Sequence, residues 1–119
     1  MKEVKIIVNQ FVANNECYMP DEGDKIFKKI EKLFNANEKV VLSFKDITFI
    51  THSFLNTAIG QLYGAFCSET IRNSLKVEGL STDDIQLLAL VIRNAKRYFV
   101  CRYDKYDCFA EEDEGEKTI

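Results

Sequence analysis

The stretch that decides the fold runs from Val40 to Gly60 and reads VVLSFKDITFITHSFLNTAIG. Its first five residues are nearly all apolar, a pattern typical of strands that are covered on both faces, as in parallel sheets. Beyond a charged turn, apolar residues recur every three or four positions from Leu55 to Phe66, which is the period of an α-helix. The stretch therefore predicts a central strand, a turn and a largely buried helix from about residue 53 to residue 71.

On the N-terminal side, Val4 to Val12 is rich in β-branched and aromatic residues and predicts a strand. We expect this strand to be the first arm of a hairpin that turns at Asn14-Asn15 and returns through Cys17 and Tyr18. Pro20, followed by two acidic residues, predicts the first turn of an amphipathic helix, because proline lacks the backbone donor that is unpaired there.

On the C-terminal side, Leu75 to Leu80 alternates apolar and polar residues and predicts a short strand. Ser81 to Asp84 predicts the capped start of a third helix. Cys101 to Phe109 fits either an edge strand or an extended loop. The order of elements predicts an α/β fold with a mixed, mostly parallel central sheet that is covered by about three helices.

Length and charge limit the domain count and the classes of function. The chain has 119 residues, of which 46% are hydrophobic, which is enough for one domain, expected over residues 1–109. Residues 110–119 predict an acidic, disordered tail. The formal net charge of −3 argues against a basic nucleic-acid binder. Because the sequence shows no secretory signal and no apolar run of membrane-spanning length, we expect a cytoplasmic protein.

Cysteine spacing gives no sign of a disulfide or metal site. The four cysteines are widely separated and form no close pair: Cys17, Cys67, Cys101 and Cys108. Structural zinc sites need about four ligands at short paired spacing, so we expect buried thiols, no metal and no cofactor.

The single histidine, His52, directly precedes Ser53. A serine hydrolase needs a base within hydrogen-bond reach of its nucleophile, and the side chains of adjacent residues at a helix start usually diverge. We therefore expect no enzymatic activity, with a small serine hydrolase as an alternative.

A second alternative is a nucleic-acid accessory protein that uses the segment from Arg93 to Tyr106. The segment mixes five basic with four aromatic residues, a composition found on nucleic-acid-binding surfaces. Cations at a helix C-terminus explain the same composition through the helix dipole, and the acidic tail would compete with phosphate for the patch.

Thr51 and Ser53 place two hydroxyl groups at the expected start of the second helix. Unpaired N–H groups and the positive dipole end favour a phosphate added there. The simpler interpretation is that one hydroxyl is the helix N-cap, worth about 1 kcal/mol.

At these residues the sequence resembles the STAS superfamily, named for sulfate transporters and anti-sigma factor antagonists, and is most similar to its bacterial STAS-like branch, which has no assigned function. The antagonists carry a pattern of roughly V-x-L-D-L-S-x-V-x-F-I-D-S-S-G-L. The chain follows this frame without a gap from Val41 to Leu55, with Gly60 later in the helix. The second serine of the pattern, the phosphorylation site of the antagonists, corresponds to Ser53.

Four positions depart from the antagonist pattern: Ser43, Thr51, His52 and Phe54. The last replaces a glycine that keeps the approach of a kinase open, whereas phenylalanine is bulky. The pattern of the STAS-like branch, F-I-T-x-S-F-L/A-D-E, matches Phe49 to Leu55, but Asn56-Thr57 stands in place of its acidic pair.

The resemblance implies a non-catalytic, regulatory domain that binds a partner protein, commonly a serine kinase of the histidine-kinase-like ATPase fold. It also implies that phosphorylation at the helix start switches this binding, with Ser53 as the candidate phosphoacceptor. The candidate partner-binding residues are Thr51, His52, Ser53, Phe54, Asn56 and Thr57.

Overall fold

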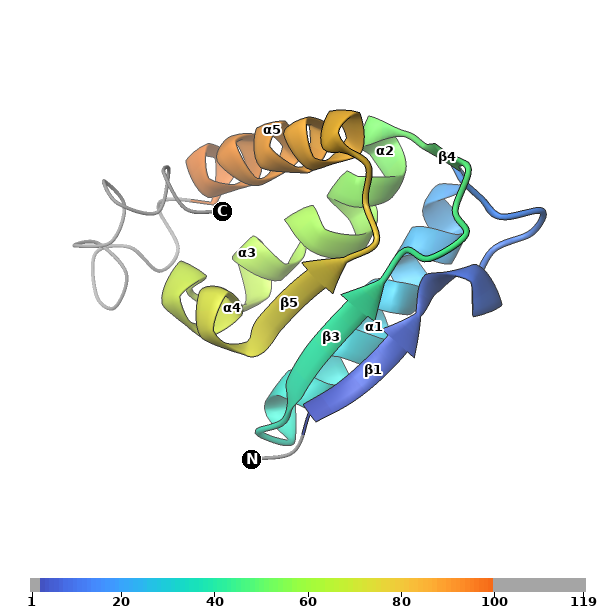
Figure 1. Ribbon diagram of the computed structural model, residues 1–119. Helices are drawn as coiled ribbons and strands as arrows, with labels where there is room; N and C mark the ends of the chain where they lie inside the picture. Colours follow the sequence, from blue (N-terminus) through green and yellow to red (C-terminus); the bar gives the residue numbers. More distant parts are fainter. Residues whose placement is uncertain (1–2, 100–119) are drawn as a thin grey trace.

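A computed structural model describes residues 3–99 of the chain (Figure 1). The expected edge strand or loop at Cys101 to Phe109 and the acidic tail at 110–119 lie outside the described residues. In chain order, the strands are β1 (Glu3–Ile7), β2 (Glu16–Cys17), β3 (Lys39–Ser43), β4 (Phe49–Ile50) and β5 (Leu75–Glu78). The helices are α1 (Pro20–Asn35), α2 (His52–Leu55), α3 (Leu62–Ala65), α4 (Ser68–Ser74) and α5 (Thr82–Tyr98), with a 3-10 helix at Val8–Gln10 and a π-helical turn at Asn56–Gly60.

The main sheet has the strand order β1-β3-β5, and both pairings are parallel. Its central strand is β3, where Leu42 pairs with Ile6 on one side and with Val77 on the other. Leu42 has 0% of its surface exposed, as the apolar run of this strand predicts. The α/β class and the parallel central sheet are therefore confirmed.

Side chains alternate between the two faces of the main sheet. Ile6 and Leu42 belong to the core that the sheet forms with the helices, and α1 lies behind the sheet in the view of Figure 1. On the other face, Lys5 of β1 reaches across β3 to Glu78 of β5 in a 3.1 Å ion pair. The sheet thus has one face packed on helices and one face covered mainly by long charged side chains.

The N-terminal hairpin prediction is wrong. The chain does turn at Asn14 and Asn15, which both have positive φ. However, the 3-10 helix ends β1 at Ile7, so the chain leaves the main sheet well before this turn. The residues after the turn form β2, which pairs in parallel with β4 (Glu16 with Phe49) in a separate two-stranded sheet.

The second predicted helix is interrupted. It begins at His52, passes through the π-helical turn and ends at Ala65, after which Phe66 and Cys67 are extended and α4 follows. The ring of Phe66 packs edge-on against Phe34 of α1 at 5.2 Å between centroids. Apolar periodicity continues through this break because Phe66 and Ile71 both contribute to the core, so the pattern alone did not reveal it.

The other two helices begin where the sequence predicts. Pro20 is the first residue of α1. Ser81 caps α5, since its hydroxyl oxygen accepts a hydrogen bond from the Asp84 N–H at 3.1 Å. Among residues 3–99, no helix is both long and apolar enough to cross a membrane.

Candidate functional site

The helices α1, α2 and α5 all begin at the same end of the molecule, near β4 (Figure 1). This arrangement follows from parallel strands: each strand ends at this edge, and the chain then turns into the next helix. The predicted site at the start of α2 therefore lies beside the first turns of two other helices.

Thr51 is the N-cap of α2. Its hydroxyl oxygen accepts a hydrogen bond from the Phe54 N–H at 3.2 Å. The hydroxyl also donates to the carbonyl oxygen of Cys17 at 3.4 Å, and the Thr51 N–H donates to the same oxygen at 3.0 Å. Thr51 thus joins α2 to β2, and the capping interpretation holds for this residue.

His52 and Ser53 are the first two residues of α2, and both are exposed. Among residues 3–99, the Ser53 hydroxyl has no hydrogen-bond partner, and no hydrogen bond joins it to His52. Its backbone oxygen accepts from the Thr57 hydroxyl at 2.9 Å. The backbone of Ser53 is therefore held in place, and its hydroxyl group makes no hydrogen bond to the part of the chain that the structure describes.

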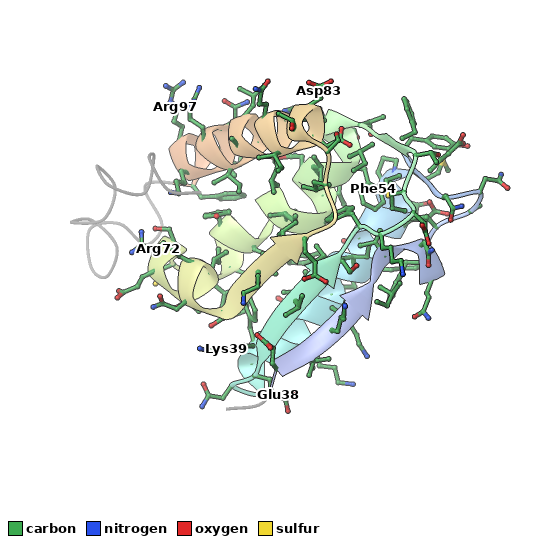
Figure 2. The ribbon with its side chains drawn as sticks, in the orientation of Figure 1. Glu38, Lys39, Phe54, Arg72, Asp83 and Arg97 are labelled. Atoms are coloured by element: carbon green, nitrogen blue, oxygen red, sulfur yellow. The ribbon has the colours of Figure 1, made fainter. Side chains whose placement is uncertain are left out.

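Phe54, which the sequence suggested as a partner-binding residue, is buried. Its side chain has 0% exposed surface and lies within the body of the molecule (Figure 2), so the prediction that it contacts a partner is wrong. The reason is the turn of the helix, which directs Phe54 and Leu55 into the core while Ser53 stays outside. A buried Phe54 also leaves Ser53 uncovered, so the bulk expected to obstruct a kinase is directed away from it. Asn56 is exposed and Thr57 is half-buried.

Two aromatic residues at this end are exposed, although the sequence did not indicate them as contact residues. Tyr18 follows β2 and Phe49 lies in β4, and their rings are 6.5 Å apart between centroids. They are 48% and 51% exposed, and the neighbouring Met19 is 42% exposed. Adjacent exposed apolar side chains are typical of protein-binding surfaces. The exposure of Phe49 could have been predicted from the alternation of side chains along β4, because Ile50 is buried and Phe49 therefore faces outward.

The electrostatics of this end are acidic. Cys17 is fully buried beneath it, and burial raises the pKa of its thiol to about 12, with smaller contributions from the charges of Glu22 and Asp84. Glu22 belongs to the first turn region of α1 and Asp84 to that of α5. Carboxylates from two helix starts therefore flank the strand that leads to Tyr18.

Close packing holds α1 against the α2 segment. A Cβ atom built on Gly23 of α1 would lie 3.0 Å from the Phe54 carbonyl oxygen and 3.2 Å from the Thr57 Cβ. The absence of a side chain at Gly23 thus permits the backbones to approach, and the start of α2 keeps its position relative to α1.

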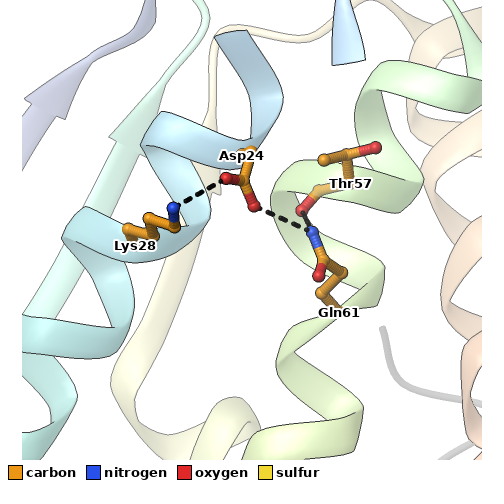
Figure 3. Close-up of polar contacts among 4 residues, drawn as sticks. All are labelled: Asp24, Lys28, Thr57 and Gln61. Carbon is orange, nitrogen blue, oxygen red and sulfur yellow. Dashed lines mark hydrogen bonds and ion pairs between the residues drawn. The ribbon is translucent and has the colours of Figure 1, made fainter. Parts of the chain in front are cut away.

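A polar network reinforces the same contact at the π-helical turn (Figure 3). The Gln61 N–H reaches back five residues to the Asn56 oxygen, and the Gln61 side-chain amide donates to the Thr57 oxygen at 2.8 Å. The same amide donates to Asp24 of α1 at 3.5 Å, and Asp24 forms a 3.2 Å ion pair with Lys28. The side chain of Gln61 therefore satisfies a carbonyl whose usual donor the turn has diverted.

The segment from Arg93 to Tyr106 is described only as far as residue 99. Arg93 and Arg97 are exposed on α5, and Tyr98 is 81% exposed. Asp83 and Arg97 lie at opposite ends of α5 (Figure 2), so this basic part is far from the start of α2. Its remaining predicted residues are outside the described part of the chain: Arg102, Tyr103, Lys105 and Tyr106.

The cysteine and acidic side chains of residues 3–99 show no metal-binding arrangement, since no three His, Cys, Asp or Glu side chains gather at one point there. Cys67 Sγ lies 3.3 Å from the Thr70 hydroxyl, and neither Cys17 nor Cys67 is in a disulfide.

Comparison with known proteins gives one family match. The model of a family described as a STAS-like domain of unknown function (DUF4325) matches residues 22–84. No curated protein and no solved structure matches the chain. The matched residues run from the first turn of α1 to the first turn of α5 and include the whole α2 segment. Because the match spans more than half of the 119 residues, the chain belongs to the STAS-like domain family.

Proposed function

We propose that this protein is a non-catalytic interaction module that binds a partner protein through one end of the molecule, here called the binding end. The binding end consists of Tyr18, Met19, Phe49, His52, Ser53 and Asn56. The observation that carries this proposal is the exposed Tyr18–Phe49 pair directly before the exposed start of α2. Exposed aromatic residues supply much of the binding energy in protein interfaces.

The proposed partner is a serine kinase of the histidine-kinase-like ATPase fold, the class implied by the resemblance to anti-sigma factor antagonists. Ser53 is the proposed phosphoacceptor, supported by its exposure and by a hydroxyl without an intramolecular hydrogen bond among the described residues. A phosphate adds about 1.5–2 negative charges to an end that already holds Glu22 and Asp84. The added charge and its desolvation cost would weaken docking, and phosphorylation therefore releases the partner.

A pull-down from lysate of the native host tests this proposal with four purified baits: wild type, Phe49→Ala, Ser53→Asp and Tyr98→Ala. Tyr98 is the matched control, because it is an exposed aromatic residue at the opposite end of α5. We expect a protein that wild type and Tyr98→Ala retain and that the other two variants retain at least about tenfold less. Equal retention by all four baits would contradict the binding end.

The kinase assignment is tested on the retained protein itself. Incubation with ATP and wild-type protein should place phosphate on Ser53, as mapped by mass spectrometry, and Ser53→Ala should remain unmodified. A retained protein that binds no ATP would contradict the partner class while leaving the binding end intact.

A second candidate function is nucleic-acid binding, which is supported by the exposure of Arg93, Arg97 and Tyr98 on α5. It predicts binding of a single-stranded oligonucleotide that weakens steeply with salt and falls with Tyr98→Ala but not with Phe49→Ala. Fluorescence anisotropy across a salt series measures this. The hydrolase alternative predicts labelling of Ser53 by a serine-reactive probe, abolished in Ser53→Ala.

A further inference from the structure

The strand β1 forms one edge of the main sheet, on the side opposite to β5 (Figure 1). Within residues 3–99, β1 pairs with β3 and with no other strand. The peptide groups of an edge strand that point away from its sheet are a template for one more strand. The direction of the peptide groups of β1 therefore determines what this edge can bind.

A hydrogen bond at the end of β3 fixes these directions. The N–H of Phe44, directly after β3, donates to the Glu78 oxygen at 2.9 Å, so the peptide groups of Phe44 point toward β5. Peptide groups alternate in direction along a strand. Those of Val41, an odd number of residues before Phe44, therefore point the other way, toward β1.

The alternate residues of β1 consequently face away from β3. Val41 is in register with Lys5, and in a parallel pair its peptide groups bond to the neighbours of that partner, Val4 and Ile6. The N–H and C=O groups of Lys5 therefore point to the outer edge of the sheet. The outward-facing residues of β1 are Glu3, Lys5 and Ile7.

A row of lysines on α1 flanks this edge. A Cβ atom built on Gly23 would lie 3.0 Å from the Phe54 carbonyl oxygen, so Gly23 marks the side of α1 that faces α2. At 3.6 residues per turn, three exposed lysines lie on the opposite side of the helix: Lys25, Lys29 and Lys32. In Figure 1, α2 lies on the β5 side of α1, and the lysine row therefore faces the β1 edge.

The charges of this row are not used in ion pairs within residues 3–99, whereas the neighbouring Lys28 pairs with Asp24 at 3.2 Å. A lysine on an edge strand commonly prevents unwanted pairing. The lysine of β1 itself, Lys5, reaches inward across β3 to Glu78 and does not extend over the outer edge. The edge thus combines outward peptide groups with adjacent positive charge.

We propose that β1 binds an extended acidic segment of a partner protein, which adds to the main sheet as one more strand beside the lysine row. Backbone hydrogen bonds to the outward groups of β1 hold the segment. Acidic side chains at alternate positions of the segment face the helix side of the sheet and meet the lysines. This site shares no residue with the binding end and goes beyond the proposed function.

Charge favours this occupant over a second copy of the chain and over nucleic acid. Two copies joined antiparallel through β1 would carry both α1 helices on the same face, with their lysine rows repelling each other. Single-stranded nucleic acid stacks its bases on aromatic side chains, and α1 has no exposed aromatic residue.

Amide hydrogen exchange of the full chain, measured by NMR, tests whether the edge gains a strand. The probe is a peptide of about eight residues in which glutamate and threonine alternate, so that all its acidic side chains share one face when it is extended. Without peptide the Lys5 amide should exchange rapidly, and saturating peptide should slow it by at least about tenfold. The Val4 amide faces β3 and is the internal reference. A Lys5 amide that is protected in the free chain, or that the peptide leaves unchanged, would overturn the proposal.

Fluorescence anisotropy with the labelled peptide tests the lysine row. Lys29→Glu reverses the charge at the middle of the row and should weaken binding by at least about tenfold. Lys76→Glu makes the same change on β5, at the opposite edge of the sheet, and should weaken binding by less than about threefold. Equal effects would overturn the proposal. So would an oligonucleotide of equal charge that binds more tightly than the peptide and leaves the Lys5 amide unprotected, which would assign the row to nucleic acid.

Two substitutions of Lys5 separate its backbone from its side chain. Lys5→Pro removes the outward N–H and leaves the peptide groups that pair with β3, at a type of position where edge strands accept proline. It should weaken peptide binding at least about tenfold more than Lys5→Ala, which keeps the N–H. Equal binding by the two variants would overturn the proposed strand. Thermal unfolding checks that both are folded, and the exchange measurement on wild type decides should Lys5→Pro unfold.

Discussion

Thr51 and Ser53 stand two residues apart at the start of α2, but their hydroxyl groups make different contacts. The Thr51 hydroxyl bonds both to the Phe54 N–H and to the Cys17 oxygen, whereas the Ser53 side chain is exposed and bonds to no described residue. One residue therefore stabilises the fold, and the other is available for modification.

Thr51→Ala should lower the free energy of unfolding by about 1–2 kcal/mol, because it removes an N-cap and a link to β2. Ser53→Ala is the matched control and should change it by less than about 0.5 kcal/mol. Urea denaturation followed by circular dichroism measures both. Equal effects of the two substitutions would contradict the assignment of the cap.

The raised pKa of the buried Cys17 thiol predicts that the protein loses stability at alkaline pH. The thiol ionises near pH 9.0 in the unfolded chain, but burial raises its pKa to about 12 in the folded protein. Above pH 9 the unfolded state loses this proton and the folded state keeps it, so the folded state should lose about 1.4 kcal/mol per pH unit until pH 12.

Urea denaturation of wild type and Cys17→Ala under reducing conditions, from pH 8 to pH 11, measures this slope. Cys17→Ala should lack the part of the slope that comes from the thiol. It should keep the pH dependence that comes from other groups, such as Tyr63, because burial also raises the pKa of Tyr63. Parallel pH profiles for the two proteins would contradict a buried, neutral Cys17.

At the scale of elements, the position of α2 depends on how closely α1 approaches it. Gly23→Ala would place a Cβ atom 3.0 Å from the Phe54 carbonyl oxygen, and backbone cannot move as a flexible side chain does. We expect a loss of about 1–3 kcal/mol. Helix propensity alone predicts a gain of about 1 kcal/mol for this substitution, so the sign measured by thermal unfolding decides between packing and propensity.

Elements defined by local patterns were predicted better than those defined by distant partners. Helix α1 was located from Pro20 and its acidic neighbours, and β3 from its apolar run. The two-residue strands β2 and β4 carry almost no local signal, because their pairing joins Glu16 to Phe49 across more than thirty residues. The Tyr18–Phe49 contact could not be predicted for the same reason, because the two residues are far apart in the sequence and each ring alone is consistent with a core position.

At the scale of the whole molecule, one core connects the main sheet to the helices. Leu42→Ala should cost about 2–5 kcal/mol, because Leu42 is fully buried in the central strand. Leu90→Ala makes the same chemical change at a residue that is 42% exposed on α5 and should cost less than about 1 kcal/mol. Chemical denaturation measures both, and comparable losses would contradict the position of the core.

The sequence by itself determined the α/β class, the central strand, the start of α2 and the STAS-like family, because these depend on periodicity, caps and motifs within about twenty neighbouring residues. Only the tertiary structure decided that Phe54 is buried, that Thr51 is the cap, and that Tyr18 and Phe49 meet beside Ser53. It also showed that, within residues 3–99, β5 pairs with β3 and lies at one edge of the main sheet. These features depend on which distant segments pack together, and that choice is made by the burial of the whole core rather than by any local pattern.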